Sequence, residues 1–112
     1  GDGSFNFSCG ELETIVRYRL PIKMFVFSNK TFGWIKAGQN SGFDKRFYNV
    51  DFGQTDHAAV ASAFGVKSWR ANKPSELGSI IAQALSHNGP ALVDIISQPL
   101  HEASAPVSEW VA

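Results

Sequence analysis

The fold is decided by the stretch Ile22-Lys23-Met24-Phe25-Val26-Phe27-Ser28, which is followed at once by Asn29. The stretch is apolar with almost no alternation, and such runs belong to strands of parallel sheets that are covered on both faces. Pro21 precedes it and ends a helix that we expect over residues 7–19, because proline cannot continue a helix. The helix is indicated by four residues that recur at helical spacing, namely Leu12, Ile15, Val16 and Arg19.

Helices and strands alternate through the rest of the chain. The expected elements are a helix capped by Thr55 or Asp56 and closed by Gly65, a short strand over 66–69, a helix opened by Pro74, and a strand over 91–96. Alternation of this kind predicts an α/β fold, in which right-handed crossovers build one parallel sheet with helices on both faces. At 112 residues the chain is a single domain, 1–112.

Two segments fall outside this alternation. Residues 34–54 are expected to form a long loop, with one short helix near 32–38, and residues 98–112 to form an extended tail. Long loops in compact domains are commonly lids or binding loops. Six aromatic residues between Phe32 and Phe52 are too many for a free loop. They either pack against a neighbouring domain or line a substrate channel.

Composition excludes several classes of protein. The chain has 10 basic and 10 acidic residues, so it lacks the charge excess that nucleic acids or anionic membranes attract. The single cysteine, Cys9, excludes an internal disulfide, fits a reducing compartment and is expected to be buried and inert. No stretch approaches the ~20 apolar residues of a membrane span. We therefore expect a cytoplasmic protein.

Side chains that bear oxygen stand at two expected strand ends. Asp2 lies within Gly1-Asp2-Gly3, a loop that we expect to follow a strand missing from this sequence, and Asn29 ends the strand quoted above. Ligands of parallel sheets bind at the carboxyl ends of strands. A carboxylate, an amide oxygen and the carbonyl of Thr31 are the ligands that Mg²⁺ prefers, and glycines let a phosphate approach the backbone. The N–H groups of Gly3 and Ser4 can receive phosphate oxygens.

The spacing of these residues resembles a known motif. Gly1-Asp2-Gly3, then 24 residues, then Ser28-Asn29 is similar to the motif of thiamine diphosphate-dependent enzymes, which reads GDG, about two dozen residues, then Asn-Asn. The chain departs from it at Ser28, whereas Asn29 keeps the position of the metal ligand. The segment Asn29-Lys30-Thr31-Phe32-Gly33 resembles the acetolactate synthase and 2-oxo acid decarboxylase group. The resemblance implies part of the C-terminal diphosphate-binding (PP) domain, with its N-terminal strands missing.

The resemblance also implies a role for each matched residue. It implies Mg²⁺ held by the side chains of Asp2 and Asn29 and by the carbonyl of Thr31. The residues that it implies for thiamine diphosphate are Asp2, Gly3, Ser4, Asn29, Thr31, Phe32 and Gly33. Trp34 and the loop after it are expected to face the substrate.

A carbonyl substrate such as a 2-oxo acid follows from the same resemblance. The implied reaction is cleavage or formation of a carbon–carbon bond next to a carbonyl, with an acetolactate synthase-like enzyme favoured over a simple decarboxylase. No catalytic residue is implied in this chain, because the activating glutamate of the family lies on a pyrimidine-binding domain, usually of a partner subunit. We therefore expect a homo-oligomeric enzyme and an isolated chain without turnover.

Other interpretations stay open at this point. A non-catalytic, flavodoxin-like phosphate-binding module would also place an acidic residue after a strand, and a folded interaction fragment would self-associate through an exposed strand edge. Asp94 is expected to make structural hydrogen bonds rather than to act in catalysis. Each histidine, His57, His87 and His101, is expected to be exposed or to cap a helix.

Overall fold

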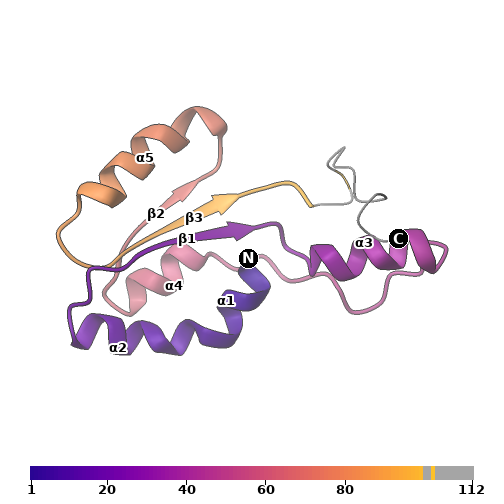
Figure 1. Cartoon of the computed structure of the whole chain (residues 1–112), viewed down its shortest axis with the longest axis horizontal. Helices are drawn as coiled ribbons and strands as arrows, with labels where there is room; N and C mark the ends of the chain where they lie inside the picture. The colour runs from indigo at the N-terminus through magenta and orange to yellow at the C-terminus, as the bar shows by residue number, and fades with distance from the viewer. Residues whose placement is uncertain (100–101, 103–112) are drawn as a thin grey trace.

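The computed structural model describes residues 1–99 and 102 and shows a parallel three-stranded sheet. Its strands are β1 (Lys23–Ser28), β2 (Lys67–Ala71) and β3 (Ala91–Ile96), and β3 lies in the middle, in the order β1-β3-β2. Helices cover both faces of the sheet (Figure 1). The predicted α/β fold is therefore confirmed.

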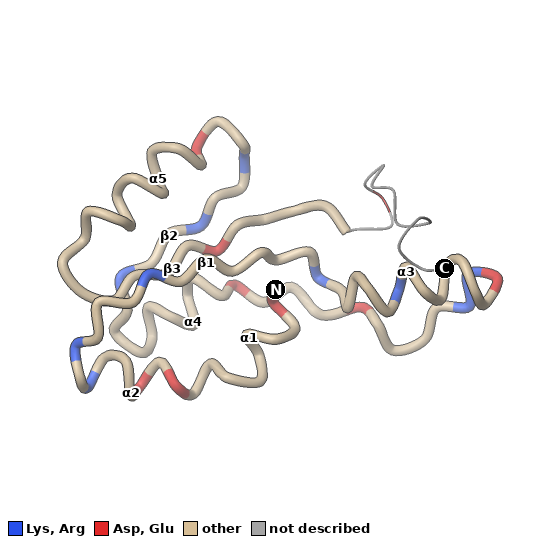
Figure 2. Tube along the Cα trace, in the orientation of Figure 1, with Lys and Arg blue, Asp and Glu red and all other residues tan. Residues whose placement is uncertain are grey.

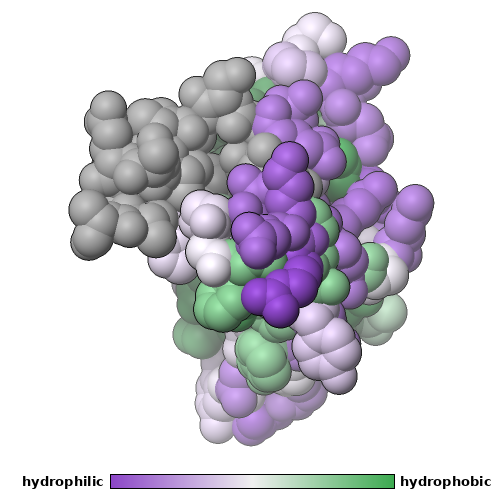
Figure 3. Space-filling view, turned by 90° about the vertical axis from the view of Figure 1, so that its right-hand side faces the viewer, coloured by the Kyte–Doolittle hydropathy of each residue, from purple (hydrophilic) through white to green (hydrophobic). Residues whose placement is uncertain are grey.

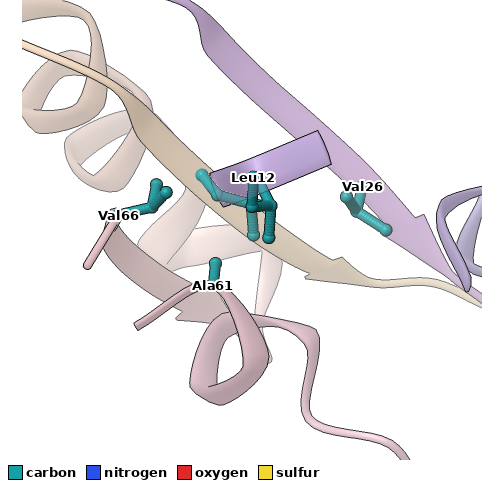
Figure 4. Packing of buried hydrophobic residues seen from close by; sticks show 5 residues of the cluster. Leu12, Val26, Ala61 and Val66 are labelled. Carbon is teal, nitrogen blue, oxygen red and sulfur yellow. The ribbon is translucent and has the colours of Figure 1, made fainter. Parts of the chain in front are cut away.

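One face of the sheet holds the larger core. Leu92 on β3 lies in register with Met24 on β1, so both side chains point to the same face. There they meet α2 (Leu12–Arg17) and α4 (His57–Ala63), and Figure 4 shows Leu12, Val26, Ala61 and Val66 converging on one another. Three of these four side chains are aliphatic and branched, and they fill the space between helices and strands without polar atoms.

The opposite face is covered by α5 (Pro74–Ser86). Ala84 of this helix packs on Ala91, Val93 and Ile95 of β3, with Trp69 of β2 beside them. The alternate residues of β1 on this face, Phe25 and Phe27, remain 36% and 55% exposed. This side of β1 is thus not covered by the described part of the chain.

The first helical region begins earlier than the sequence predicts. It runs as α1 (Asp2–Ser8), a short 3₁₀ turn η1 (Cys9–Glu11) and α2, so residues 2–6 are helical rather than a loop. The 3₁₀ turn contains Gly10, a weak helix former that tolerates the change of winding. The helix ends at Arg17, and Arg19 lies in the left-handed region at φ 51°, so Arg19 does not continue the helical spacing predicted for it.

The segment predicted as a long loop contains a ten-residue helix. This helix, α3 (Gly33–Gly42), extends past the expected end at residue 38 and projects beyond the carboxyl ends of the strands (Figure 1). The chain then returns to the sheet without a regular element, and a single antiparallel bridge joins Thr31 to Asp51. The predicted short helix is thus present, but its last four residues, 39–42, were assigned to the loop, because glycine, asparagine and serine there weaken the helical signal.

Local signals placed the later helices correctly. Asp56 caps α4 by accepting a hydrogen bond from the Ala59 N–H (2.8 Å), and Gly65 follows the helix at φ 93°. Pro74 is the first residue of α5. The predicted tail lies outside the described residues except for residues 98, 99 and 102, and His101 lies outside them as well.

Charges of both signs are spread along the chain (Figure 2). Among residues 1–99 and 102, no helix has the length and apolar character needed to cross a bilayer.

Candidate functional site

A hollow of about 400 Å³ lies at the carboxyl ends of the strands, between the start of α1 and the start of α3. The lining residues are Gly1, Asp2, Gly3, Ser4, Asn29, Thr31, Phe32, Gly33, Trp34 and Ile35. They include every residue that the sequence predicted for the site. Figure 3 looks onto this end of the molecule, where apolar residues (green) lie among polar ones (purple). The two segments, 27 residues apart at Asp2 and Asn29, therefore meet as expected.

Asp2 is held in place by two backbone amides. Its Oδ2 accepts a hydrogen bond from the Lys30 N–H (2.7 Å), and its Oδ1 accepts one from the Gly3 N–H (3.0 Å). The side chain is 3% exposed. Lys30 adopts the uncommon left-handed conformation at φ 61° in the turn that follows β1. Since a carboxylate oxygen has two lone pairs, each oxygen of Asp2 keeps one for a further ligand.

Asn29 and Thr31 form the opposite wall of the hollow. The Asn29 Oδ1 accepts a hydrogen bond from the Thr31 N–H (3.1 Å), a local turn that fixes the direction of the carboxamide. The Thr31 hydroxyl donates to the Val50 carbonyl (2.8 Å), which ties this turn to the chain returning from α3. Both residues are held in place by hydrogen bonds before any ligand binds. A cation site requires oxygen ligands that are preorganised in this way.

Gly3 is required by a close approach of two aromatic rings. A Cβ at this position would lie 2.8 Å from Phe32 Cε1 and 3.0 Å from Phe52 Cζ. The two rings stack edge to face with their centroids 4.4 Å apart. No side chain fits between α1 and this pair, so the backbone at Gly3 stays open to the hollow.

The donor set suits a hard cation and a phosphate group. Among the described residues, Asp2 is the only acidic residue that lines the hollow. The other oxygen ligands available there are the side-chain amide of Asn29 and the hydroxyls and carbonyls of Thr31 and Ser4. Oxygen ligands of this kind match Mg²⁺ or Ca²⁺ rather than a metal that prefers sulfur or imidazole. In residues 1–99 and 102, no group of three or more His, Cys, Asp or Glu side chains converges. The residues present therefore fit a divalent cation that shares its shell with ligand phosphates.

The first turn of α1 adds backbone N–H groups on the same side. No backbone carbonyl within the helix accepts from these groups, because the first four N–H groups of any helix lack an acceptor four residues earlier; the Gly3 N–H bonds instead to Asp2 Oδ1 (3.0 Å). Gly3 and Ser4 belong to this turn and line the hollow. Trp34 also lines it and is 57% exposed, as expected for a side chain that faces a ligand.

His57 is buried, contrary to the sequence prediction. It is 3% exposed, and its two ring nitrogens face Ser28 and Asn6, each at 3.0 Å. Asp94 is fully buried and accepts a hydrogen bond from the Ser28 hydroxyl, which agrees with the structural role expected for it. Cys9 is partly exposed rather than buried. The sequence around His57 has no pattern that predicts burial, because this residue is buried by contacts with Asn6 and Phe5 of α1, which lie far from it in the chain.

Comparison with known proteins identifies the family. Residues 1–95 match the family model described as "Thiamine pyrophosphate enzyme, C-terminal TPP binding domain". The "Probable acetolactate synthase large subunit" of Methanococcus aeolicus is 34% identical over 100 residues, which cover 88% of this chain and 17% of that protein. The "Acetolactate synthase" of Bacillus subtilis is 35% identical over 95 residues, which cover 85% of this chain and 16% of that protein.

The chain thus spans about one sixth of the length of these relatives. The matched part includes the hollow, β1, β2 and all of β3 except its last residue, Ile96. The predicted resemblance is confirmed, and the chain belongs to the thiamine pyrophosphate enzymes as a C-terminal TPP-binding domain.

Proposed function

We propose that the chain forms the Mg²⁺- and diphosphate-binding part of a thiamine diphosphate site in an acetolactate synthase-like enzyme. The observation that carries the proposal is the 2.7 Å hydrogen bond from the Lys30 N–H to Asp2 Oδ2, which sets Asp2 beside Asn29 at one hollow. Family membership supplies the cofactor, and the anchored oxygens supply a reason for the cation.

The roles follow from the chemistry of each group. The Asp2 carboxylate, the Asn29 carboxamide and the Thr31 carbonyl hold Mg²⁺, which neutralises the diphosphate. Gly3 and Ser4 present backbone N–H groups to the diphosphate, and Phe32 and Gly33 shape the wall next to it. Thiamine diphosphate, when bound, supplies the nucleophilic carbon and the electron sink for making or breaking a carbon–carbon bond next to a carbonyl.

The complete enzyme needs more than these residues. We propose a 2-oxo acid or related carbonyl as substrate, a pyrimidine-binding domain or partner subunit that supplies the activating glutamate, and a homo-oligomer in the cytoplasm. The resemblance to acetolactate synthases of several organisms supports this reaction class over a simple decarboxylase. The chain by itself is expected to lack turnover, since the activating glutamate is expected on the pyrimidine-binding domain and, within the part of the chain that the structure describes, Asp2 alone brings an acidic side chain to the hollow.

Calorimetric titration of the full-length protein with thiamine diphosphate, with and without Mg²⁺, tests the proposal. We expect binding that requires Mg²⁺ in the unmodified protein. Asp2→Asn keeps an oxygen for the Lys30 N–H but removes the charge, so Mg²⁺-dependent binding should be lost while the fold is retained.

Asp44→Asn is the matched control, because Asp44 is an exposed aspartate after α3 that does not line the hollow. It should bind like the unmodified protein. Binding that ignores Mg²⁺, or an Asp2→Asn variant that binds normally, would overturn the assigned roles. Absence of any binding would instead favour the non-catalytic, flavodoxin-like module, for which family membership gives no support.

A further inference from the structure

A buried polar network lies directly beneath the hollow, and His57 is its centre. The imidazole Nε2 is 3.0 Å from the Asn6 Oδ1 on α1, and Nδ1 is 3.0 Å from the Ser28 Oγ at the end of β1. The ring also contacts Phe5 of α1 edge-on, with the ring centroids 5.5 Å apart. One side chain at the start of α4 therefore joins α1 to β1.

The network continues to the middle of the sheet. The Ser28 hydroxyl donates to Asp94 Oδ1 (2.5 Å), and Asp94 is 0% exposed. Within the described residues, Asp94 Oδ2 has no hydrogen-bond partner, and Arg70 Nε lies 3.7 Å from it. Burial of a carboxylate is costly unless charge and hydrogen bonds compensate. Asp94 therefore depends on the Ser28 hydroxyl and on the nearby Arg70 guanidinium to offset the cost of its burial.

The network bonds to both segments that carry the proposed metal-binding residues, Asp2 and Asn29. Asn6 lies one helical turn after Asp2 on α1, and Ser28 immediately precedes Asn29. The Asp2–Lys30 hydrogen bond joins the same two segments above the network. The spacing of Asp2 and Asn29 is therefore fixed from two sides, and a sliding motion of α1 along β1 would break the bonds to His57.

We propose that His57 is a positioning residue that sets the distance between Asp2 and Asn29 for the cation and the diphosphate. The inference rests on the proposed function of these two residues. It also gives a reason for Ser28 at the position where the motif has asparagine. The Ser28 hydroxyl lies within hydrogen-bond distance of both Asp94 Oδ1 (2.5 Å) and the imidazole Nδ1 (3.0 Å), whereas a longer carboxamide would extend into the space that the ring occupies.

Variants of His57 separate its two bonds. His57→Gln can place its amide where Nε2 lies and so keep the link to Asn6, whereas His57→Asn reaches only the position of Nδ1 and keeps the link to Ser28. The measurement is the dissociation constant of Mg²⁺ at saturating thiamine diphosphate, by calorimetry on the full-length protein. We expect His57→Ala to weaken Mg²⁺ binding by about 10-fold or more, as for other outer partners of metal sites. His57→Gln and His57→Asn each keep one of the two links, so each should recover part of this loss.

Ser68→Ala is the matched control. The Ser68 hydroxyl donates to the Ala58 carbonyl (2.7 Å) and so ties α4 to β2, but it touches neither α1 nor the hollow. The urea midpoint of every variant is measured without ligands. Ser68→Ala should lower the midpoint and leave the Mg²⁺ dissociation constant unchanged.

The outcomes distinguish the inference from the function on which it rests. If the unmodified protein binds thiamine diphosphate with Mg²⁺ but the His57 variants bind Mg²⁺ equally well, the inference fails and the function stands. The inference also fails if Ser68→Ala weakens Mg²⁺ as much as His57→Ala at the same midpoint, because loss of stability then explains both. Absence of Mg²⁺-dependent binding in the unmodified protein removes both claims.

Discussion

Gly3 sits where a methyl group has no room. The nearest atoms to an added Cβ belong to Phe32 and Phe52, whose rings are themselves packed edge to face. At the residue scale, the shape of the hollow therefore depends on one glycine and two rings, in addition to the oxygen donors.

Gly3→Ala should displace this aromatic pair and distort the hollow. We expect the free energy of unfolding to fall by about 1–3 kcal/mol, the usual cost of overpacking, and thiamine diphosphate to bind more weakly. Gly78→Ala is the control, because an added Cβ in the middle of α5 meets nothing within 4 Å. It should raise the stability by about 0.5–1 kcal/mol. Urea unfolding and calorimetric titration measure both effects, and a Gly3→Ala variant as stable as the unmodified protein would contradict the packing argument.

The meeting of Asp2 with Asn29 and the hydrogen-bonding role of Asp94 could be predicted from the sequence, whereas the burial of His57 could not. Asp2 and Asn29 could be paired from the sequence because the carboxyl ends of parallel strands share one edge. His57 could not, because its environment is made by Asn6, Ser28 and Phe5, which lie far from it in sequence. A histidine that opens a helix next to a capping aspartate usually faces solvent, and only the crossing of α1 over α4 makes this one buried.

At the scale of elements, α4 starts with a side-chain cap whose charge is sensitive to pH. The pKa of the Asp56 carboxyl lies below its ordinary value, first because it accepts a hydrogen bond from the Ala59 N–H and then because Arg70 lies beside it; partial burial opposes these effects. The carboxylate is therefore favoured by folding. Its stabilisation is complete above the pKa of the unfolded chain and is lost as the pH falls through the lower pKa of the folded protein.

Two substitutions separate the cap from the charge. Asp56→Ala should lower the free energy of unfolding at neutral pH by about 1 kcal/mol, the usual value of a helix cap. Asp56→Asn keeps a capping oxygen, so it should cost less at neutral pH, and its difference from the unmodified protein should vanish as the pH falls. Urea unfolding from pH 7 down to pH 3 measures both curves. A difference between Asp56→Asn and the unmodified protein that persists or grows in acid would show that the charge has no such role.

The success of the element predictions followed the strength of the local signals. β1 and β3 are continuous apolar runs, and α4 and α5 carry a capping aspartate and an initial proline, so all four were found within one or two residues. The start of α1 was wrong, because Gly1 offers no side-chain cap to mark it. α3 was cut short, because its glycine, asparagine and serine residues resemble a loop, whereas contacts with the returning chain stabilise a helix.

At the scale of the whole molecule, β1 is an edge strand with two exposed phenylalanines. Phe25 and Phe27 point to the side that α5 covers only over β2 and β3. An exposed strand edge next to an apolar surface favours pairing with other chains. We therefore expect the isolated 112-residue chain to self-associate.

Phe27→Thr should weaken this association, because it removes apolar area while keeping a residue that favours strands. Loss of one buried phenylalanine, about 1.5–3 kcal/mol, corresponds to about a 10-fold or larger rise in the dissociation constant of a dimer. Phe7→Thr is the control, since Phe7 is 84% exposed on α1, a helix whose Phe5 packs on the face of the sheet opposite to Phe27. Light scattering over a range of concentrations measures the effect, and a monodisperse monomer at high concentration would refute it.

The strand order has a consequence for synthesis on the ribosome. β1 and β2 are never neighbours, because β3 is inserted between them and supplies every hydrogen-bonded pairing of the sheet. β3 is also the last of the three to be translated. Until β3 has left the exit tunnel, β1 and β2 therefore lack the strand that pairs with both of them in the described residues, and deletion of residues 91–96 is expected to leave them unable to form this sheet.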